Sequence, residues 1–227
     1  MDRIDKLFYI NLERRPDRNT HFLNECAKIH IPNDKIERYN AIDGSKMKNG
    51  DVDITLFKNA DYMNKPFANN IIGNQLSHFN ILKEMVHRNY NYIMVCQDDV
   101  IFRDDFFTSL DDVLNAAPDN TEIINIGFNK RAVHSFSEAW DFNELNTKGV
   151  MVNEHICKLY HYVNPCSMSY IVTRQGAINM IEWFHKTGFL RSTDHNYNQY
   201  LISKDIFYGS IKVLCTGNPQ LGSDVFI

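Results

Sequence analysis

Nine residues near the middle of the chain indicate both its fold class and a possible site: Tyr92-Ile93-Met94-Val95-Cys96-Gln97-Asp98-Asp99-Val100. The apolar start is typical of a strand buried in a sheet. Packing explains the two carboxylates poorly, because like charges repel and each is costly to bury unpaired. Ligands of α/β sheets bind at the carboxyl ends of strands. The pair is therefore a candidate site for Mg²⁺ or Mn²⁺, which prefer oxygen ligands. The alternative is a solvated turn that caps the next helix.

The composition is that of an ordinary globular protein. The chain has 227 residues, of which 44% are hydrophobic and 23% charged, so extensive disorder and a coiled coil are excluded. The net charge of -4, with scattered lysines and arginines, argues against a large nucleic-acid-binding surface. No linker, repeat or change of composition divides the sequence, and we expect one domain over residues 1–227.

Cysteine usage and the N-terminal residues bear on the cellular compartment. The five cysteines form no C-x-x-C pair, so neither a zinc site nor a disulfide framework is indicated: Cys26, Cys96, Cys157, Cys166 and Cys215. Residues 1–6 alternate in charge without the apolar core of a signal peptide, and no apolar run approaches membrane-spanning length. These patterns predict reduced thiols and a cytoplasmic location.

Strand and helix patterns alternate along the chain. Strands are predicted over 7–12, 36–39, 92–97, 122–127, 168–172 and 211–215. Helices are predicted over 16–29, 75–87, 104–115, 174–185 and 194–202, with a long loop at 45–70 and an irregular stretch at 128–154. The alternation predicts an α/β fold: a single, Rossmann-like, mostly parallel sheet with helices on both faces.

The usual nucleotide motifs are missing. No G-x-G-x-x-G follows the first strand, and no Walker A pattern occurs. The G-x-S-x-G pattern of a catalytic serine is absent as well. Asn11, Arg15 and Arg18 follow the first strand instead, and arginines at such a strand end can bind a diphosphate. Alternatively, these arginines are solvated or bridge to Asp17 and Glu13.

Two further segments contain potentially catalytic side chains. Ser77 and His78 are adjacent on a predicted helix and so point apart, which favours a helix-surface or capping role over a catalytic pair. Asp194 lies at a predicted loop-to-helix junction. It could act as a general base or simply as the N-cap of its helix.

Short segments recur here in a recognisable order. They are Tyr9-Ile10-Asn11-Leu12 with Arg15 and Asp17-Arg18, Ala41-Ile42-Asp43-Gly44, Ile72-Gly73, Leu76-Ser77-His78, Asp98-Asp99-Val100, Ile124-Asn125-Ile126-Gly127, Ser169-Tyr170-Ile171-Val172-Thr173 with Gly176-Ala177, the Asp194 segment, and Pro219 with Ser223-Asp224. The chain thereby resembles glycosyltransferase family 25, the lipo-oligosaccharide glycosyltransferase and procollagen galactosyltransferase group. The resemblance implies a GT-A fold and metal-dependent, inverting transfer of galactose or glucose from a UDP-sugar to a hydroxyl of collagen hydroxylysine or of a glycan.

The resemblance also implies roles for individual residues. Mn²⁺ or Mg²⁺ would be held by Asp99 with Asp98, and Asp194 would be the general base. Asp224 is the second candidate for the base and a candidate third metal ligand, on a tail that could close over the donor. The expected contacts of the UDP-sugar are Asn11, Leu12, Arg15, Arg18, Ala41, Asp43, Ser77, His78, Gln97 and Asp98.

One position departs from the family pattern. The family has Glu-Asp-Asp at the acidic turn, and this chain has Gln97-Asp98-Asp99, with one negative charge fewer. Two alternatives follow: a sugar-nucleotide-binding protein with weakened catalysis, or a nucleotidyltransferase. The latter would need a glycine- and lysine-rich loop after its first strand, which is absent. Many collagen-modifying relatives also carry a second such domain and secretory signals, neither of which we expect here.

Overall fold

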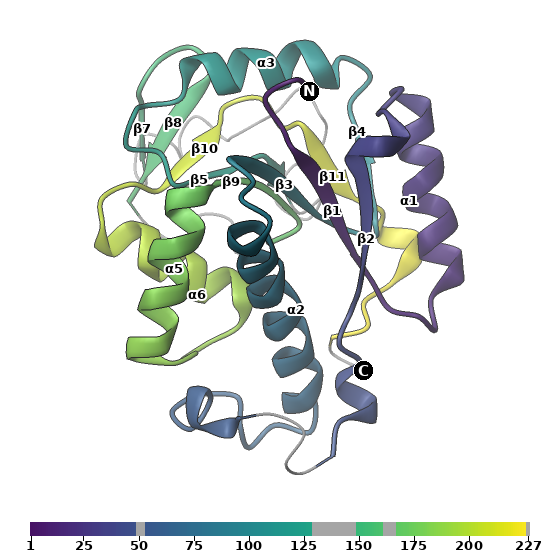
Figure 1. Ribbon diagram of the computed structural model, residues 1–227, viewed down its shortest axis with the longest axis vertical. Coiled ribbons are helices and arrows are strands. Elements are labelled where there is room, and N and C mark those ends of the chain that lie inside the picture. Colours follow the sequence, from purple (N-terminus) through teal and green to yellow (C-terminus); the bar gives the residue numbers. More distant parts are fainter. Residues whose placement is uncertain (49–52, 129–148, 161–166, 226–227) are drawn as a thin grey trace.

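The computed structural model describes residues 1–48, 53–128, 149–160 and 167–225 (Figure 1). The helices are α1 (Pro16–Lys28), α2 (Ala68–His87), α3 (Phe106–Ala116), α5 (Arg174–Thr187) and α6 (Thr193–Ser203), with short 3₁₀ turns at Asn33–Lys35, Gly44–Lys46, Ile54–Leu56 and Pro219–Leu221. The strands are β1 (Lys6–Asn11), β2 (Ile36–Asn40), β3 (Tyr92–Gln97), β4 (Val100–Phe102), β5 (Ile123–Asn125), β6 (Gly127–Phe128), β7 (Gly149–Met151), β8 (Ile156–Leu159), β9 (Ser169–Thr173), β10 (Tyr208–Ser210) and β11 (Cys215–Gly217).

The main sheet confirms the α/β class and has the order β2-β1-β3-β9-β5-β10-β8-β7. Its β2-β1-β3 segment is parallel, as is the β5-β10 pair. The remaining neighbours are antiparallel, so the sheet is mixed where the sequence predicted a mostly parallel one. The reason is that β9 lies between β3 and β5 and runs antiparallel to both. The composition of an apolar strand does not indicate its direction. A second sheet has the order β4-β11-β6.

Helices cover both faces of the main sheet, as predicted. Alternate residues of β1 point to opposite faces. Tyr9 stacks on Phe22 of α1 with ring centroids 4.2 Å apart, whereas Phe8 lies 6.5 Å from Tyr90, just after α2. In Figure 1, α2, α5 and α6 lie together in front of the sheet, and α1 lies beside β4. The parallel edge of the sheet is thereby fixed between α1 and α2.

Several element boundaries differ from those predicted. Helix α2 begins at Ala68, not Gln75, because burial of Ala68, Ile71 and Ile72 outweighs the low helix propensity of the intervening asparagines. The predicted strand 211–215 is wrong: β10 ends at Ser210 and β11 starts at Cys215. Strands β4, β7 and β8 were not predicted, since each is short. Most of the predicted irregular stretch, 129–148, lies outside the described residues.

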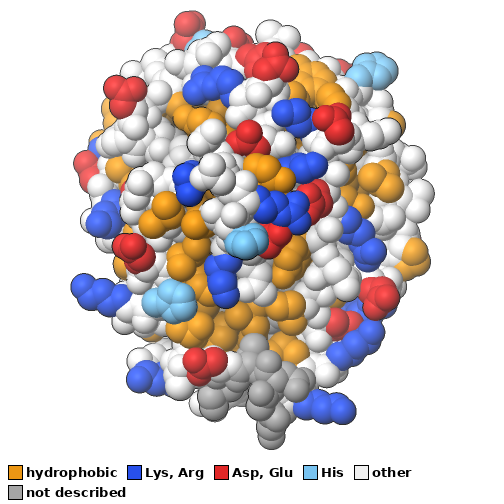
Figure 2. Space-filling view, in the orientation of Figure 1, with side chains coloured by type: hydrophobic (Ala, Val, Ile, Leu, Met, Phe, Trp, Pro, Cys, Tyr) orange, Lys and Arg blue, Asp and Glu red, His pale blue; other side chains and the backbone are white. Residues whose placement is uncertain are grey.

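Surface charge and cysteine state agree with the composition. Basic and acidic side chains are interspersed on the face shown in Figure 2. Cys26, Cys96, Cys157 and Cys215 are buried free thiols, and Cys166 lies outside the described residues. Among the described helices, none is long and apolar enough to cross a membrane.

Candidate active site

The parallel strands β1, β2 and β3 end at one edge of the sheet, where a pocket with a cavity volume of about 100 Å³ opens. The pocket brings together predicted site residues that lie far apart in sequence: Leu12, Arg18, Ala41, Asp43, Ser77, Gln97, Asp98, Asp99 and Asp224. Asn11, Arg15, His78 and Asp194 are not among the residues that line it.

Asp98 is buried, with both carboxylate oxygens engaged. Arg18 Nη1 donates to Oδ1 at 2.8 Å, and Asn11 Nδ2 donates to Oδ2 at 2.7 Å. Arg38 Nε donates to Oδ1 of Asn11 at 2.9 Å, which turns the amide nitrogen of Asn11 toward Asp98. Asn11 therefore positions Asp98 from behind the pocket. The predicted alternative of a solvated turn is wrong for Asp98, whose exposed fraction is 5%.

Asp99 differs from Asp98 in having a free oxygen. Its Oδ1 is buried without a hydrogen-bond partner among the described residues, and its Oδ2 lies 3.7 Å from Nη1 of Arg18. Burial raises the pKa of Asp99 to about 6; the charge of Arg18 opposes this shift and that of Asp98 adds to it. The N-cap of α3 is Asp105, so neither Asp98 nor Asp99 caps that helix. Asp99 lines the pocket and carries an acceptor oxygen without a partner among the described residues.

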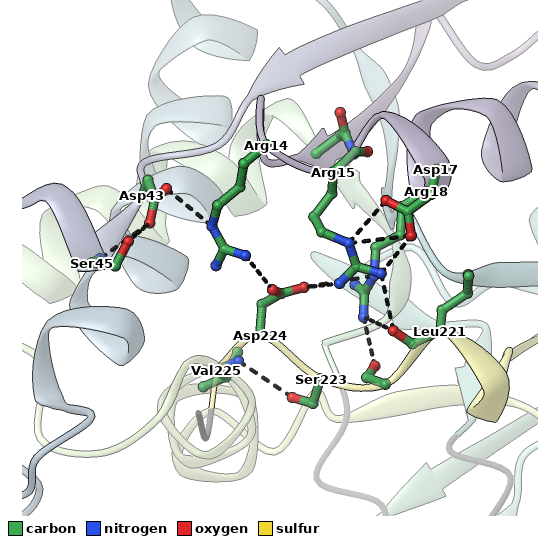
Figure 3. Close-up of polar contacts among 12 residues, drawn as sticks. Arg14, Arg15, Asp17, Arg18, Asp43, Ser45, Leu221, Ser223, Asp224 and Val225 are labelled. Carbon is green, nitrogen blue, oxygen red and sulfur yellow. Dashed lines mark hydrogen bonds and ion pairs between the residues drawn. The ribbon is translucent and has the colours of Figure 1, made fainter.

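Three arginines hold the segment after β11 against this pocket (Figure 3). Asp224 lies between Arg14 and Arg15: Arg14 Nη1 donates to Oδ1 at 2.6 Å, and Arg15 Nη1 donates to Oδ2. Arg15 Nη2 also donates to the carbonyl of Leu221 at 3.0 Å, and Arg18 Nη2 to that of Gly222 at 2.5 Å. The arginine cluster, Arg14, Arg15 and Arg18, thus holds residues 221–224.

The outer arginines have further partners. Arg14 Nε donates to Oδ2 of Asp43 at 3.2 Å. Arg15 pairs with Asp17 at 2.7 Å, which was the alternative considered for it. Hydrogen bonds to Asp224 and Asp17 raise the pKa of Arg14 and Arg15 respectively. The sequence prediction missed Arg14, although it stands in the charged cluster that follows β1.

The turn at Ala41–Gly44 lines the pocket beside Arg14 and rests on α2. Ser77 Oγ accepts from the amide of Ile42 at 2.9 Å and donates to the carbonyl of Gly73 at 2.7 Å. A Cβ added at Gly73 would lie 2.4 Å from the carbonyl oxygen of Ile42, so only glycine allows this approach. Ser77 is wholly buried, and its predicted helix-surface or capping role is wrong.

His78 is also wholly buried, so the same prediction is wrong for it. Its Nδ1 lies 3.0 Å from the hydroxyl of Tyr170, and burial lowers its pKa to about 3. Both errors have one cause: α2 packs against α5, α6 and the sheet, so little of its middle remains at the surface. His78 lies in the interior and is not among the residues that line the pocket.

Asp194 lies at the start of α6, in a small cavity next to the main pocket. The N-cap of α6 is Ser192, so the prediction that Asp194 is only a cap is wrong. Its Oδ1 accepts from Ser192 Oγ at 2.6 Å and from the amide of His195 at 3.0 Å. Burial opposes ionisation of Asp194, but hydrogen bonds from His195 and Ser192 outweigh it and lower its pKa. Asp194 is therefore ionised at neutral pH.

Two contacts connect Asp194 to the main pocket. Ser167 lines the Asp194 cavity and its Oγ lies 3.5 Å from Nε2 of Gln97, which lines the main pocket. Thr193 Oγ1 donates at 2.7 Å to Oδ1 of Asn74, another main-pocket residue. Sequence reasoning missed Asn74, since a polar residue on a helix has no distinguishing signal.

A divalent cation fits this site only in part. Among the described residues, no three His, Cys, Asp or Glu side chains are grouped so that they could hold a metal ion. The oxygens of Asp98 and Asp224 already accept hydrogen bonds from arginine and asparagine side chains. The buried free oxygen of Asp99 does fit, because Mg²⁺ is commonly bound through one or two carboxylates plus substrate phosphates.

Comparison with known proteins agrees with this architecture. Residues 4–196 match the model of glycosyltransferase family 25 (LPS biosynthesis protein), a range that includes Asp99 and Asp194. A glycosyltransferase 25 family member of Drosophila pseudoobscura pseudoobscura is 27% identical over 78% of this chain, and procollagen galactosyltransferase 2 of Homo sapiens is 30% identical over 54%. The inactive glycosyltransferase 25 family member 3 of Homo sapiens is 31% identical over 45%.

The matched parts cover 27%, 20% and 18% of the lengths of these three relatives, so the chain spans about a quarter or less of each. The family match, in contrast, extends over most of this chain. The chain therefore belongs to glycosyltransferase family 25.

Proposed function

We propose that this protein moves a hexose, galactose or glucose, from a UDP-sugar to a hydroxyl group of a glycan or of hydroxylysine, with inversion and with the help of Mn²⁺ or Mg²⁺. The observation that carries the proposal is the buried, unpartnered oxygen of Asp99 at the end of β3, in a pocket that also holds Arg18. A carboxylate with a free oxygen suits a cation, and the arginine suits a phosphate.

Asp99 would hold the cation, which would supply charge neutralisation of the departing diphosphate. Asp98 supports this role indirectly, because its ion pair with Arg18 fixes the guanidinium beside Asp99. Arg18 is buried and aimed at the same point, so it is the second positive group for the leaving diphosphate. Leu12, Ala41 and Asp43, which line the same pocket, would contact the nucleoside.

Asp194 would accept the proton of the attacking hydroxyl. Inversion requires a base on the face of the sugar opposite the leaving group. Asp194 is ionised, and the hydrogen bonds that Ser192 and the amide of His195 donate at the start of α6 go to its Oδ1. The acceptor oxygen forms a bond to the anomeric carbon, its proton passes to Asp194, and the bond to the diphosphate oxygen breaks. UDP and the glycoside are the products.

The test is release of UDP from UDP-galactose and UDP-glucose in the presence of Mn²⁺. We expect the wild-type protein to release UDP and Asp99→Asn to lose this activity while remaining folded. Asp104→Asn is the matched control: Asp104 is 91% exposed, pairs with Lys28 and lies outside the pocket, so its rate should not change. An equal rate in Asp99→Asn and wild type would refute the role of Asp99.

A second candidate is a sugar-nucleotide-binding protein with weakened catalysis. Gln97 removes one negative charge from the acidic turn, and some matched relatives are named inactive. Such a protein would bind UDP with the same residues but would release no UDP from either sugar nucleotide. The assay above therefore separates the two candidates, provided that UDP binding is measured in parallel.

A further inference from the structure

Asp224 lies where an anionic ligand would be expected. Its carboxylate accepts one hydrogen bond from Arg14 and one from Arg15, and Arg18 Nε lies 3.7 Å from Oδ2 (Figure 3). Only 9% of the Asp224 side chain is exposed, and the residue lines the same pocket as Asp98 and Asp99. A carboxylate is the protein group whose charge and geometry come closest to those of a phosphate oxygen pair.

We define the tail as residues 218–225. Hydrogen bonds from the arginine cluster hold it. Arg15 and Arg18 bind the carbonyls of Leu221 and Gly222, and the amide of Asn218 donates to the carbonyl of Asp99 at 2.7 Å. Gly222 has a φ of 74° and nothing lies within 4 Å of where its Cβ would be, so the chain here turns in open space. For the tail to lift away, these hydrogen bonds and the packing of Val225 against the hydrophobic core would have to break.

We propose that the tail is a displaceable internal inhibitor, in which Asp224 competes with a phosphate-class anion for Arg14 and Arg15. The inference rests on the proposed function insofar as it identifies that anion as the diphosphate of the donor. When the tail is bound, Arg14 bridges the two carboxylates, with its Nε donating to Asp43 and its Nη1 donating to Asp224. Displacement of Asp224 frees Nη1 of Arg14 and Nη1 of Arg15 for the ligand.

This arrangement differs from a lid that closes over bound donor. A lid gains contacts when ligand binds, so ligand and tail stabilise each other. A competitor loses contacts, so ligand and tail oppose each other. The two arrangements therefore predict opposite effects of removing the Asp224 carboxylate, because apparent affinity falls with the fraction of protein that is not binding-competent.

The test measures binding of pyrophosphate and of UDP to wild-type protein and to Asp224→Asn by calorimetry. We expect about tenfold tighter binding of both in the variant, which corresponds to a tail that is bound about nine-tenths of the time. Asp17→Asn is the matched control for charge: Asp17 also pairs with Arg15 but is 54% exposed and does not line the pocket. The affinities of the Asp17→Asn variant for pyrophosphate and UDP should differ from those of the wild type by less than about twofold.

Hydrogen exchange of residues 218–225 gives a second readout that does not depend on a variant. Ligand should accelerate exchange in this segment of the wild-type protein. Unchanged or weaker binding in Asp224→Asn, or slower exchange with ligand, would overturn the proposal. Loss of a Mn²⁺ effect on UDP binding in this variant would also overturn it and would assign Asp224 as a metal ligand. If the wild-type protein binds pyrophosphate but not UDP, the assignment of a UDP-sugar as donor fails. The competition between Asp224 and the anion is then still tested with pyrophosphate.

Discussion

At the scale of single residues, the chemistry of the pocket depends on which carboxylate oxygens still lack a hydrogen-bond donor. Asp98 has no such oxygen, because Arg18 donates to one of its carboxylate oxygens and Asn11 to the other. Asp99 keeps one. Two adjacent aspartates with the same sequence signature therefore have different environments: both oxygens of Asp98 are hydrogen-bonded, and one oxygen of Asp99 lacks a partner among the described residues. This division follows from long-range contacts with α1 and β1 and has no counterpart in the local sequence.

Asp194→Asn tests the assignment of the general base. Asparagine cannot accept a proton as a carboxylate does, so turnover should fall by roughly two to four orders of magnitude. The fold should persist, since Ser192 is the N-cap of α6. UDP binding should be unchanged, because the base acts on the acceptor. Near-normal turnover in this variant would move the search for the base elsewhere.

Gln97→Glu restores the family's carboxylate. Gln97 lines the pocket beside Asp98 and Asp99, so the added charge should tighten Mn²⁺ binding in the presence of UDP by about 1 kcal/mol. Titration of Mn²⁺ into the UDP complex provides the measurement. An unaltered affinity would mean that the side chain at position 97 points away from the cation and contacts the nucleoside or Ser167 instead.

At the scale of elements, the shape of the pocket depends on how closely the Ala41–Gly44 turn approaches α2. Gly73→Ala would place a methyl group 2.4 Å from the carbonyl oxygen of Ile42. We expect a loss of about 1–3 kcal/mol in the free energy of unfolding, as for other overpacked contacts, and weaker UDP binding as the turn moves. Urea unfolding and UDP titration would measure both effects.

Lys83→Ala is the control for Gly73→Ala. Lys83 lies on the exposed face of the same helix, and this change should alter the free energy of unfolding by no more than about 0.5 kcal/mol. If Gly73→Ala were as mild as the control, the close packing of the turn would not matter for the pocket.

The start of α6 should show a pH-dependent stability. The hydrogen bond to Asp194 raises the pKa of His195, so the pair stabilises the fold fully below the unfolded pKa of about 6.5. That contribution is lost as the pH rises through the higher folded pKa. Because His195 is partly exposed, we expect only about 0.5 kcal/mol.

Urea unfolding of wild type and His195→Gln at pH 5.5 and 8.5 would detect this difference. The difference in unfolding free energy between the wild type and His195→Gln should be larger at pH 5.5 than at pH 8.5. A gap that stays constant across this range would show that the charge of His195 does not contribute.

The elements also show how far the sequence could be read. Long periodic segments such as α1, α5 and β3 were predicted almost to the residue, because a core-facing side chain recurs at a regular spacing. Short strands such as β4 and β8 carry too few residues for such a pattern. The antiparallel entry of β9 and the contact of Arg14 with Asp224 depend on tertiary neighbours, which no local pattern reports.

At the scale of the whole molecule, three distant parts of the chain meet at one edge of the sheet. The segment after β1, the turn after β3 and the tail beyond β11 all contribute charged groups to one pocket. Figure 3 shows the arginines of the first segment bound to Asp224 of the tail. Residues 4–196 match the family, so the tail lies beyond the matched range. The prediction of a single domain over 1–227 stays a prediction.

The central claim is a donor site for UDP and a cation at Asp99, and thermal unfolding with UDP, with and without Mn²⁺, tests it most directly. UDP with Mn²⁺ at about a hundred times its dissociation constant should stabilise the wild type by about 2.7 kcal/mol. For a protein of this size that is a rise in Tm of about 5–10 °C. UDP alone should give less, and Asp99→Asn should lose the effect of Mn²⁺. A Tm that no combination of UDP and Mn²⁺ changes would contradict the account.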